Sequence, residues 1–187
     1  MNVIIFGPPG AGKGTQALNI VNKFNLYQIS TGDLLRNEVR NQTDVGKDIE
    51  DIISKGDFAT DEIVNELIKN VISDPAKKNK LIFDGYPRSL SQAQNLDKLL
   101  IKSNQKIDFV FFLNVKKETI IKRIEKRKLL EKRSDDNLVT ILKRYDTYME
   151  TTKPVLDFYS KKPKFYEING DGKIDEISTK IEQILSV

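Results

Sequence analysis

The sequence of 187 residues contains no cysteine and no histidine. Without cysteine there is no disulfide, no thiolate zinc site and no cysteine nucleophile. Without histidine, no imidazole can act as a nucleophile or transfer protons near neutral pH. Any catalysis must therefore depend on carboxylates, lysines, arginines, backbone dipoles and bound metal. Phosphoryl transfer suits these groups, because it depends on positioning and charge stabilisation more than on a tuned general base.

Long hydrophobic runs and a strong charge imbalance are also missing. No apolar run approaches the roughly 20 residues of a membrane helix, and the apolar N-terminal stretch is short for a signal peptide and lacks a basic leader. Hydrophobic residues make up 39% and charged residues 31%, the balance of a soluble globular protein. The net charge of +4 indicates one anion-binding site rather than a nucleic-acid surface. We therefore expect one cytoplasmic domain with no membrane or nucleic-acid partner.

The most informative feature is a glycine-rich loop between a hydrophobic strand and an amphipathic helix. The predicted strand Val3–Phe6 leads into Gly7-Pro8-Pro9-Gly10-Ala11-Gly12-Lys13-Gly14-Thr15, and a helix is predicted over Lys13–Phe24. Glycines let successive N–H groups point at one anion, and the positive end of the helix adds its field. Lys13 supplies a mobile full charge. This context predicts the binding of nucleotide phosphates.

Short apolar runs alternate with longer helical patterns along the chain. Strands are predicted at 3–6, 27–29, 81–83, 109–113 and 165–168. Strand–helix alternation predicts an α/β fold of the P-loop NTPase type, in three layers, with a five-stranded parallel sheet flanked by helices. The helical patterns cover 13–24, 32–40, 46–55, 61–73, 90–102, 116–128, 136–160 and 173–185.

Two segments interrupt this alternation. Residues 30–79 contain no strand pattern, and we expect a helical insertion at the ligand-binding edge of the sheet. Residues 126–136 form a shorter, densely charged interruption.

Three further motifs carry charged or hydroxyl side chains. They are Ser30-Thr31-Gly32-Asp33-Leu34-Leu35-Arg36, then Asp84-Gly85-Tyr86-Pro87-Arg88 with Gln92 downstream, then Arg133-Ser134-Asp135-Asp136 followed by Arg144. Each alone is weak, but with the phosphate loop, in this order and spacing, they strongly resemble adenylate kinase. The resemblance runs from the first strand to the loop Ile168-Asn169-Gly170-Asp171-Gly172, essentially the whole chain.

The resemblance implies a reversible transfer of the γ-phosphoryl group of ATP to AMP, giving two ADP, with Mg²⁺ as cofactor and a monomer as the family default. It also implies one kinase domain over 1–187, with a core of 1–29, 60–125 and 137–187, a monophosphate-binding subdomain of 30–59 and a lid of 126–136. Many bacterial relatives carry a long lid there, sometimes with four zinc-binding cysteines. Only Lys128-Leu129-Leu130-Glu131-Lys132 separates Arg127 from Arg133, so this chain resembles the short-lid type without zinc.

The resemblance also assigns roles to individual residues. The water shell of Mg²⁺ would be oriented by Asp84. The catalytic cations would be Lys13, Arg88, Arg127, Arg133 and Arg144. ATP would be bound by Gly10, Ala11, Gly12, Lys13, Gly14, Thr15, Arg127 and the backbone around Gly172. AMP would be bound by Thr31, Arg36, Asp57, Phe58, Ala59, Gly85, Tyr86, Pro87, Arg88, Gln92, Arg133 and Arg144.

Some of these residues have a simpler local explanation. Ser30 with Asp33, and Ser89 with Gln92, match helix-capping boxes. Asp135 and Asp136 favour the start of a helix. The lysines of 122–132 match a solvated face, and Arg123 among them receives no site role.

Three other functions compete with the adenylate kinase interpretation. A UMP/CMP kinase uses the same scaffold but typically carries alanine where Thr31 stands, so Thr31 and Gln92 together favour adenine. A P-loop GTPase switch requires an N-K-x-D segment, which Asn114-Val115-Lys116-Lys117 does not supply. A nucleic-acid-binding protein is suggested by the basic run 122–133, but that run lacks interleaved aromatic side chains.

Overall fold

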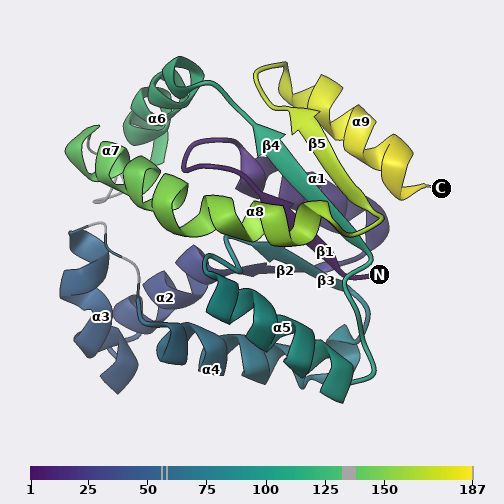
Figure 1. Cartoon of the computed structure of the whole chain (residues 1–187). Helices are drawn as coiled ribbons and strands as arrows, with labels where there is room; N and C mark the ends of the chain where they lie inside the picture. Colours follow the sequence, from purple (N-terminus) through teal and green to yellow (C-terminus); the bar gives the residue numbers. More distant parts are fainter. Residues whose placement is uncertain (56, 58, 132–137, 187) are drawn as a thin grey trace.

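The computed structural model describes residues 1–55, 57, 59–131 and 138–186. Within them, a parallel five-stranded sheet with the order β2-β3-β1-β4-β5 lies at the centre (Figure 1). This confirms the predicted α/β fold. The strands are β1 (Val3–Phe6), β2 (Tyr27–Ser30), β3 (Leu81–Asp84), β4 (Phe109–Asn114) and β5 (Phe165–Asn169).

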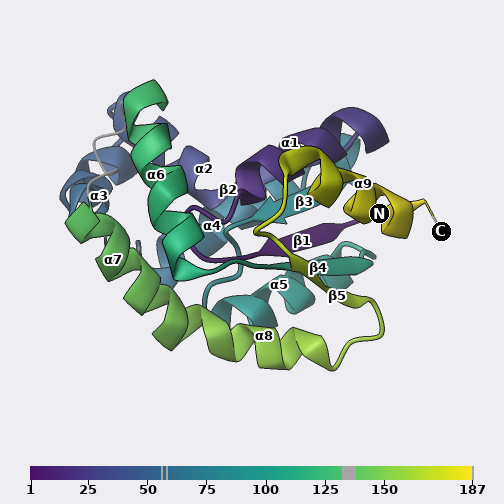
Figure 2. The ribbon, with the colours of Figure 1, turned by 90° about the horizontal axis from the view of Figure 1, so that it is seen from above.

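Helices cover both faces of the sheet (Figure 2). One face carries α1 (Lys13–Phe24) and α9 (Ile174–Leu185), and the other carries α4 (Asp61–Ile72), α5 (Leu90–Lys102) and α8 (Lys153–Ser160). The remaining helices are α2 (Thr31–Arg40), α3 (Asp44–Ser54), the 3₁₀ turn η1 (Pro75–Lys77), α6 (Lys117–Glu131) and α7 (Leu138–Thr147). In the part of the chain that the structure describes, no helix is both long and apolar enough to span a bilayer.

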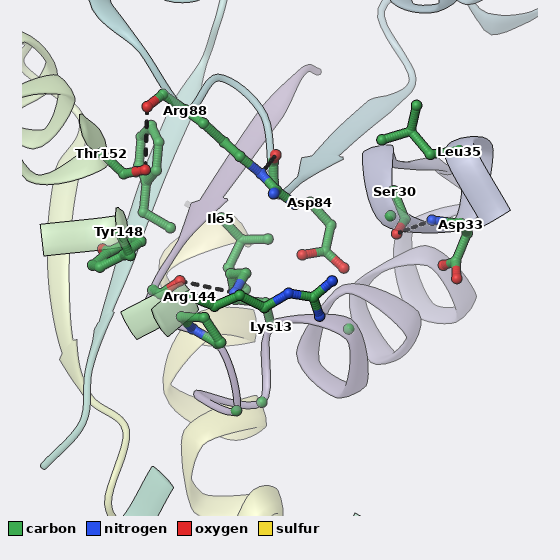
Figure 3. Close-up of a pocket in the computed structure, with 18 of the residues that line it drawn as sticks. Ile5, Lys13, Ser30, Asp33, Leu35, Asp84, Arg88, Arg144, Tyr148 and Thr152 are labelled. Atoms are coloured by element: carbon green, nitrogen blue, oxygen red, sulfur yellow. Dashed lines mark hydrogen bonds between the residues drawn. The ribbon is translucent and has the colours of Figure 1, made fainter. Parts of the chain in front are cut away.

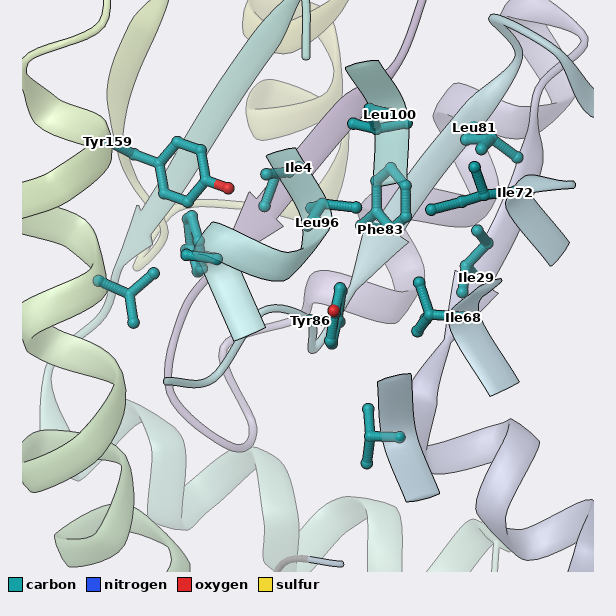
Figure 4. Packing of buried hydrophobic residues seen from close by; sticks show 14 of the residues in the cluster. Ile4, Ile29, Ile68, Ile72, Leu81, Phe83, Tyr86, Leu96, Leu100 and Tyr159 are labelled. Atoms are coloured by element: carbon teal, nitrogen blue, oxygen red, sulfur yellow. The ribbon is translucent and has the colours of Figure 1, made fainter. Parts of the chain in front are cut away.

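Strand β1 is buried on both faces because its side chains alternate between two hydrophobic layers. Val3 and Ile5 pack with the cluster under α1 and α9, whereas Ile4 and Phe6 pack with the cluster under α4, α5 and α8 (Figure 4). All four side chains are at most 3% exposed. Burying each such side chain stabilises the fold by about 1.5 to 3 kcal/mol. The carboxyl end of β1, where the phosphate loop begins, is therefore rigidly anchored.

The strand order brings the loops after β1 and β3 to the same edge of the sheet. β1 pairs with β3 on one side and with β4 on the other. The register places Ile5 opposite Asp84, so the phosphate loop and the Asp84–Arg88 motif leave the sheet side by side. In open parallel sheets, ligands bind at the carboxyl edge where the connections diverge to opposite sides. The fold therefore creates a site at this edge.

The helix predicted over 136–160 contains an irregular turn. Its described part consists of α7, a five-residue π-helical turn η2 (Tyr148–Thr152) and then α8. The amide of Lys153 donates to the carbonyl of Tyr148, five residues back. Pro154 follows directly, and a proline has no N–H and its ring would clash with the carbonyl four residues back in a regular α-helix. The widened turn accommodates the proline. In a second difference, α6 extends to Glu131, beyond its predicted end at 128.

Helices α2 and α3 pack so closely that one position accepts only glycine. Gly46 is buried in the first turn of α3, and a Cβ there would overlap the backbone carbonyl of Glu38 at the α2 side. We expect Gly46→Ala to push the two helices apart and to lower the free energy of unfolding by about 1 to 3 kcal/mol, as measured by urea denaturation. Asp48→Ala, at an exposed position of the same helix, is the control. Equal stability of the two variants would contradict the close packing.

Candidate active site

A cavity of about 330 Å³ lies at the carboxyl edge of the sheet. Segments far apart in the sequence surround it: the phosphate loop, the loop after β3, α2, α3, α6 and α7 (Figure 3). Positive side chains outnumber negative ones among the described residues of its wall, so the cavity favours a polyanion. The charged residues of the wall are Lys13, Arg36, Arg88, Arg123, Arg127, Arg144, Asp33, Asp57 and Asp84.

The phosphate loop depends on glycine at two positions. Gly10 has φ +79° and Gly12 has φ +92°, in the left-handed region that other residues rarely adopt. A Cβ at Gly10 would also lie 2.7 Å from Cδ1 of Ile124, so the loop packs directly on α6. Helix α1 begins at Lys13. The first N–H groups of a helix have no partner within it, and together with its dipole they favour an anion at this end.

The side chain of Lys13 folds back over this loop. Its Nζ donates to the carbonyl oxygens of Gly7 at 2.8 Å and Pro8 at 3.1 Å. Burial lowers the pKa of Lys13 to about 8; Asp84 raises it in part, and the cations of Arg88 and Arg127 lower it further. The ammonium group is therefore poorly compensated, which favours binding of an anion.

Arg88 is held in place before any ligand arrives. Its Nε donates to the carbonyl of Gly85 at 2.7 Å, and its Nη2 donates to Oγ1 of Thr31 at 3.3 Å. Burial lowers the pKa of Arg88 to about 10, with Arg144 and Arg36 acting in the same direction and Asp84 against it. The guanidinium stays protonated at neutral pH and is already oriented, so binding a phosphate orders few further side-chain torsions.

Asp84 ends β3 inside this cationic site. Its side chain is largely buried, and Nε2 of Gln28 donates to its Oδ2 at 3.1 Å. Burial raises the pKa of Asp84, while Lys13, the Gln28 hydrogen bond and Arg88 act in the opposite direction. The described residues contain no cluster of three or more acidic, histidine or cysteine ligands. An ion held by Asp84 would therefore take its other ligands from phosphate and water, which is how Mg²⁺ commonly binds.

The α2–α3 side of the cavity combines a cation with an apolar wall. Arg36 pairs with Asp33 one turn earlier on α2, with 2.6 Å between Nη2 and Oδ1. Leu35, Ile53 and Ala59 contribute apolar surface to the same wall. A cation beside an apolar surface suits a nucleoside monophosphate, which carries a charged phosphate and a flat base.

The predicted site residues fall into three groups. On the cavity wall lie Gly10, Gly12, Lys13, Gly14, Arg36, Asp57, Ala59, Asp84, Gly85, Pro87, Arg88, Arg127 and Arg144. Off the wall lie Ala11, Thr15, Thr31, Tyr86, Gln92 and Gly172. Phe58 and Arg133 lie outside the described residues.

Thr31 and Gln92 lie directly behind the wall. Oγ1 of Thr31 donates to the carbonyl of Gly85 at 2.8 Å, and Oε1 of Gln92 accepts from the backbone N–H of Arg88 at 2.7 Å. The N–H of Gln92 is also bonded to Oγ of Ser89. The capping interaction proposed for Ser89 is thus present, and both side chains support the Arg88 loop.

Arg123 is a site residue that the sequence analysis did not predict. Its guanidinium donates to the carbonyls of Ala11 at 3.1 Å, Gly170 at 2.8 Å and Gly172 at 3.3 Å, and it lines the cavity. It joins the phosphate loop to the C-terminal loop. Its spacing of four residues from Arg127 places both on one face of α6, a signal that the sequence contained.

Tyr148 and Thr152, at the two ends of the π-helical turn, are two further wall residues that the sequence analysis did not predict. Both side chains line the cavity, and Oγ1 of Thr152 donates to the carbonyl of Arg88 at 3.2 Å (Figure 3). No local pattern marks this pair, because the hydrogen bond spans 64 residues of sequence.

A phosphate loop between the first strand and the first helix of a parallel sheet, facing a cavity rich in lysine and arginine, defines the class of P-loop nucleotide-binding proteins. Comparison with known proteins narrows this class. The family model for adenylate kinase matches residues 5–164. The chain is 49% identical to the adenylate kinase of Pelagibacter ubique (strain HTCC1062), with all of both chains covered. It is 40% identical to the adenylate kinase of Parabacteroides distasonis, covering 100% of this chain and 98% of that one. The chain belongs to the adenylate kinase family.

The lowered pKa of Lys13 predicts a pH-dependent stability. Between about 8 and the ordinary value of 10.5, the unfolded chain keeps a proton that the folded protein has released. The free energy of unfolding of the ligand-free protein should therefore rise with pH across this window, and the cost of burying the ammonium is fully present below it. Lys13→Met should be more stable than wild type at pH 7, by about 1 to 3 kcal/mol.

Urea denaturation at pH 7 and at pH 9.5 measures this difference. Lys98→Met, at an exposed position of α5, is the control and should behave like wild type. A Lys13→Met protein with the same stability as wild type at both pH values would contradict the destabilised ammonium.

Proposed function

We propose that this member of the adenylate kinase family, an ATP:AMP phosphotransferase, transfers the γ-phosphoryl group of ATP to AMP reversibly inside this cavity. The observation that carries the proposal is the convergence of Lys13, Arg88, Arg127 and Arg144 from four separate segments on one wall. Two polyanions must meet face to face, and their repulsion is the main obstacle to reaction. Preorganised cations offset that repulsion without reorganisation during the reaction. The product, ADP, would serve adenine nucleotide homeostasis and salvage.

ATP is assigned to the phosphate-loop side. The residues from Gly10 to Thr15 would surround its phosphates, with Lys13 and Arg127 as the charged contacts. The hydrogen bonds of Arg123 to Ala11 and Gly170 support placing the base near the C-terminal loop, because they bring that loop, with Gly172, beside the phosphate loop.

AMP is assigned to the α2–α3 side. Arg36 and Arg88 would bind its phosphate, and the fixed position of Arg88 over Gly85 supports this role. Arg144 would lie between the two nucleotides, since its charge already affects Arg88. The base contacts would come from Thr31, Asp57, Phe58, Ala59, Gly85, Tyr86, Pro87 and Gln92.

Asp84 would hold Mg²⁺ through its water shell. When bound, the ion would supply positive charge to the phosphate oxygens of ATP as charge develops in the transition state. The ion held by Asp84 and the ammonium group of Lys13 would then both act on the phosphates of ATP.

Water must be excluded from the reaction, because ATP would otherwise be hydrolysed. We assign closure to the monophosphate-binding subdomain 30–59 and to the lid 126–136, which would bring Arg133 to both substrates. A short lid is supported by the alignment lengths. The alignment to the Pelagibacter relative spans 213 positions, more than the 187 residues of this chain, whereas that to the Parabacteroides relative spans 186. We further propose a cytoplasmic monomer without a zinc site.

A coupled assay with different acceptors tests the choice of base. With MgATP as donor, we expect AMP to be phosphorylated much more efficiently than UMP, CMP or GMP, because Thr31 and Gln92 back the acceptor pocket. Equal or better use of UMP or CMP would support the UMP/CMP kinase alternative. No ADP formation with any acceptor would refute the kinase activity.

Substitution of the two central cations tests the mechanism. Lys13→Met and Arg88→Met should each lower kcat by about 10² to 10³-fold or more, since each removes a charge that stabilises the transferring group. Arg40→Met is the matched control, because Arg40 is exposed at the end of α2, where its guanidinium donates to Oδ1 of Asn37 on the same helix. Near-wild-type turnover of either cavity variant, with cooperative folding retained, would refute its assignment.

A further inference from the structure

The side-chain amide of Gln92 is held at both ends by groups of opposite hydrogen-bonding character. Its Oε1 accepts from the backbone N–H of Arg88 at 2.7 Å, and its Nε2 donates to Oδ1 of Asp61 at 2.6 Å. The residue is only 4% exposed. Asp61 belongs to the first turn of α4, so this amide connects two elements 31 residues apart in sequence.

These two partners allow a single orientation of the amide. A backbone N–H can only donate, and an ionised carboxylate can only accept. Rotating the amide by half a turn would place its NH₂ against the N–H of Arg88 and its oxygen against the carboxylate of Asp61. Both contacts would be repulsive, and both half-buried partners would lose their hydrogen bonds. Asp61 thus excludes the rotated form from one side, and Arg88 excludes it from the other.

Asp61 is itself fixed in position. The hydroxyl of Ser89 donates to its Oδ2 at 2.9 Å, and the same hydroxyl oxygen accepts from the backbone N–H of Gln92 at 3.1 Å. Asp61, Ser89 and Gln92 therefore form a closed ring of hydrogen bonds. Ala59 and Arg88, close to Asp61 and Ser89 in the sequence, lie on the cavity wall. The ring stands directly behind the pocket assigned to AMP.

We propose that Asp61 is a positioning residue that makes the acceptor pocket select adenine over 6-oxopurines by fixing the amide orientation of Gln92. This inference rests on the proposed function, in which Gln92 contacts the base of AMP. An amide oxygen has two acceptor positions and an amide nitrogen has two N–H groups, so one of each remains for the base.

The two classes of purine present opposite patterns to this amide. Adenine offers an amino donor at C6 and an acceptor at N1, which match an oxygen and an N–H. Hypoxanthine and guanine offer a carbonyl oxygen at C6 and an N–H at N1, which match only the rotated amide. A site built to pair with one hydrogen-bonding pattern rejects the other strongly, because its own polar groups are left unpaired.

The test compares IMP with AMP as acceptors at saturating MgATP. IMP is the sharper probe because it reverses the pattern at C6 and N1 without adding the 2-amino group of GMP. In Asp61→Asn, the side chain keeps its shape but can offer an N–H to a rotated Gln92. The ratio of kcat/KM for IMP to that for AMP should rise by about 10-fold, the KM for AMP should rise, and the KM for ATP should stay unchanged. Asp61→Ser, whose hydroxyl can also donate or accept, should shift the ratio in the same direction.

Glu62→Gln is the matched control. Glu62 is exposed in the same first turn of α4, so this variant removes the same charge from the same helix end without touching Gln92. Its IMP/AMP ratio should equal that of wild type. An equal shift in Glu62→Gln and Asp61→Asn would refute the positioning role, because the effect would then come from the charge at the helix end.

Gln92→Leu separates failure of this inference from failure of the proposed function. If Gln92→Leu leaves the IMP/AMP ratio unchanged, Gln92 does not contact the base and its proposed role is wrong. If Gln92→Leu changes the ratio but neither folded Asp61 variant does, only the role of Asp61 is wrong. A raised ratio in Gln92→Leu and in the Asp61 variants, with the control unchanged, supports the proposal.

Discussion

The structure depends on holding several cations close together, within a cavity, before any anion is present. Burial and mutual repulsion lower the pKa of Lys13 to about 8 and that of Arg88 to about 10. Burying charge is unfavourable unless it is compensated. In this protein the compensation from Asp84 is partial, so the cavity has a strong preference for phosphates. Under the proposed function, relief of this repulsion would contribute to the binding of a pair of nucleotides.

The rest of the fold holds these cations in place against their mutual repulsion. β1 is buried on both faces, and its register with β3 sets the phosphate loop beside Asp84 and Gly85. Backbone carbonyl oxygens hold the cations in place. Those of Gly7 and Pro8 accept from Lys13, and that of Gly85 accepts from Arg88. These carbonyl groups belong to loops whose ends are fixed by buried strands. The cations are therefore oriented by rigid backbone and need little further ordering when a ligand binds.

The polar groups behind the cavity wall have a different task from the charges on it. Charges on the wall attract any phosphate, whereas the hydrogen bonds of Thr31, Gln92 and Asp61 have fixed directions. A directional donor–acceptor pattern can distinguish bases that have the same shape. In the proposed function, affinity for nucleotides in general and selectivity for one base would thus come from two layers of the same site.

The sequence by itself determined the α/β class, the five strands and the phosphate loop, because these follow from short-range patterns: apolar runs, glycine spacing and a helix start. It also contained the motifs that carry Arg36, Arg88, Arg127 and Arg144, which the fold brings to one cavity. The spacing of Arg123 from Arg127 was visible in the sequence, but only the tertiary structure decided which groups Arg123 binds, since its partners lie 47 to 112 residues away. The capping pair of Ser89 and Gln92 has a local pattern, but the contacts of both side chains to Asp61 do not, because they form only when α4 packs beside α5. Local spacing predicts which elements form, but which side chains meet depends on how those elements pack.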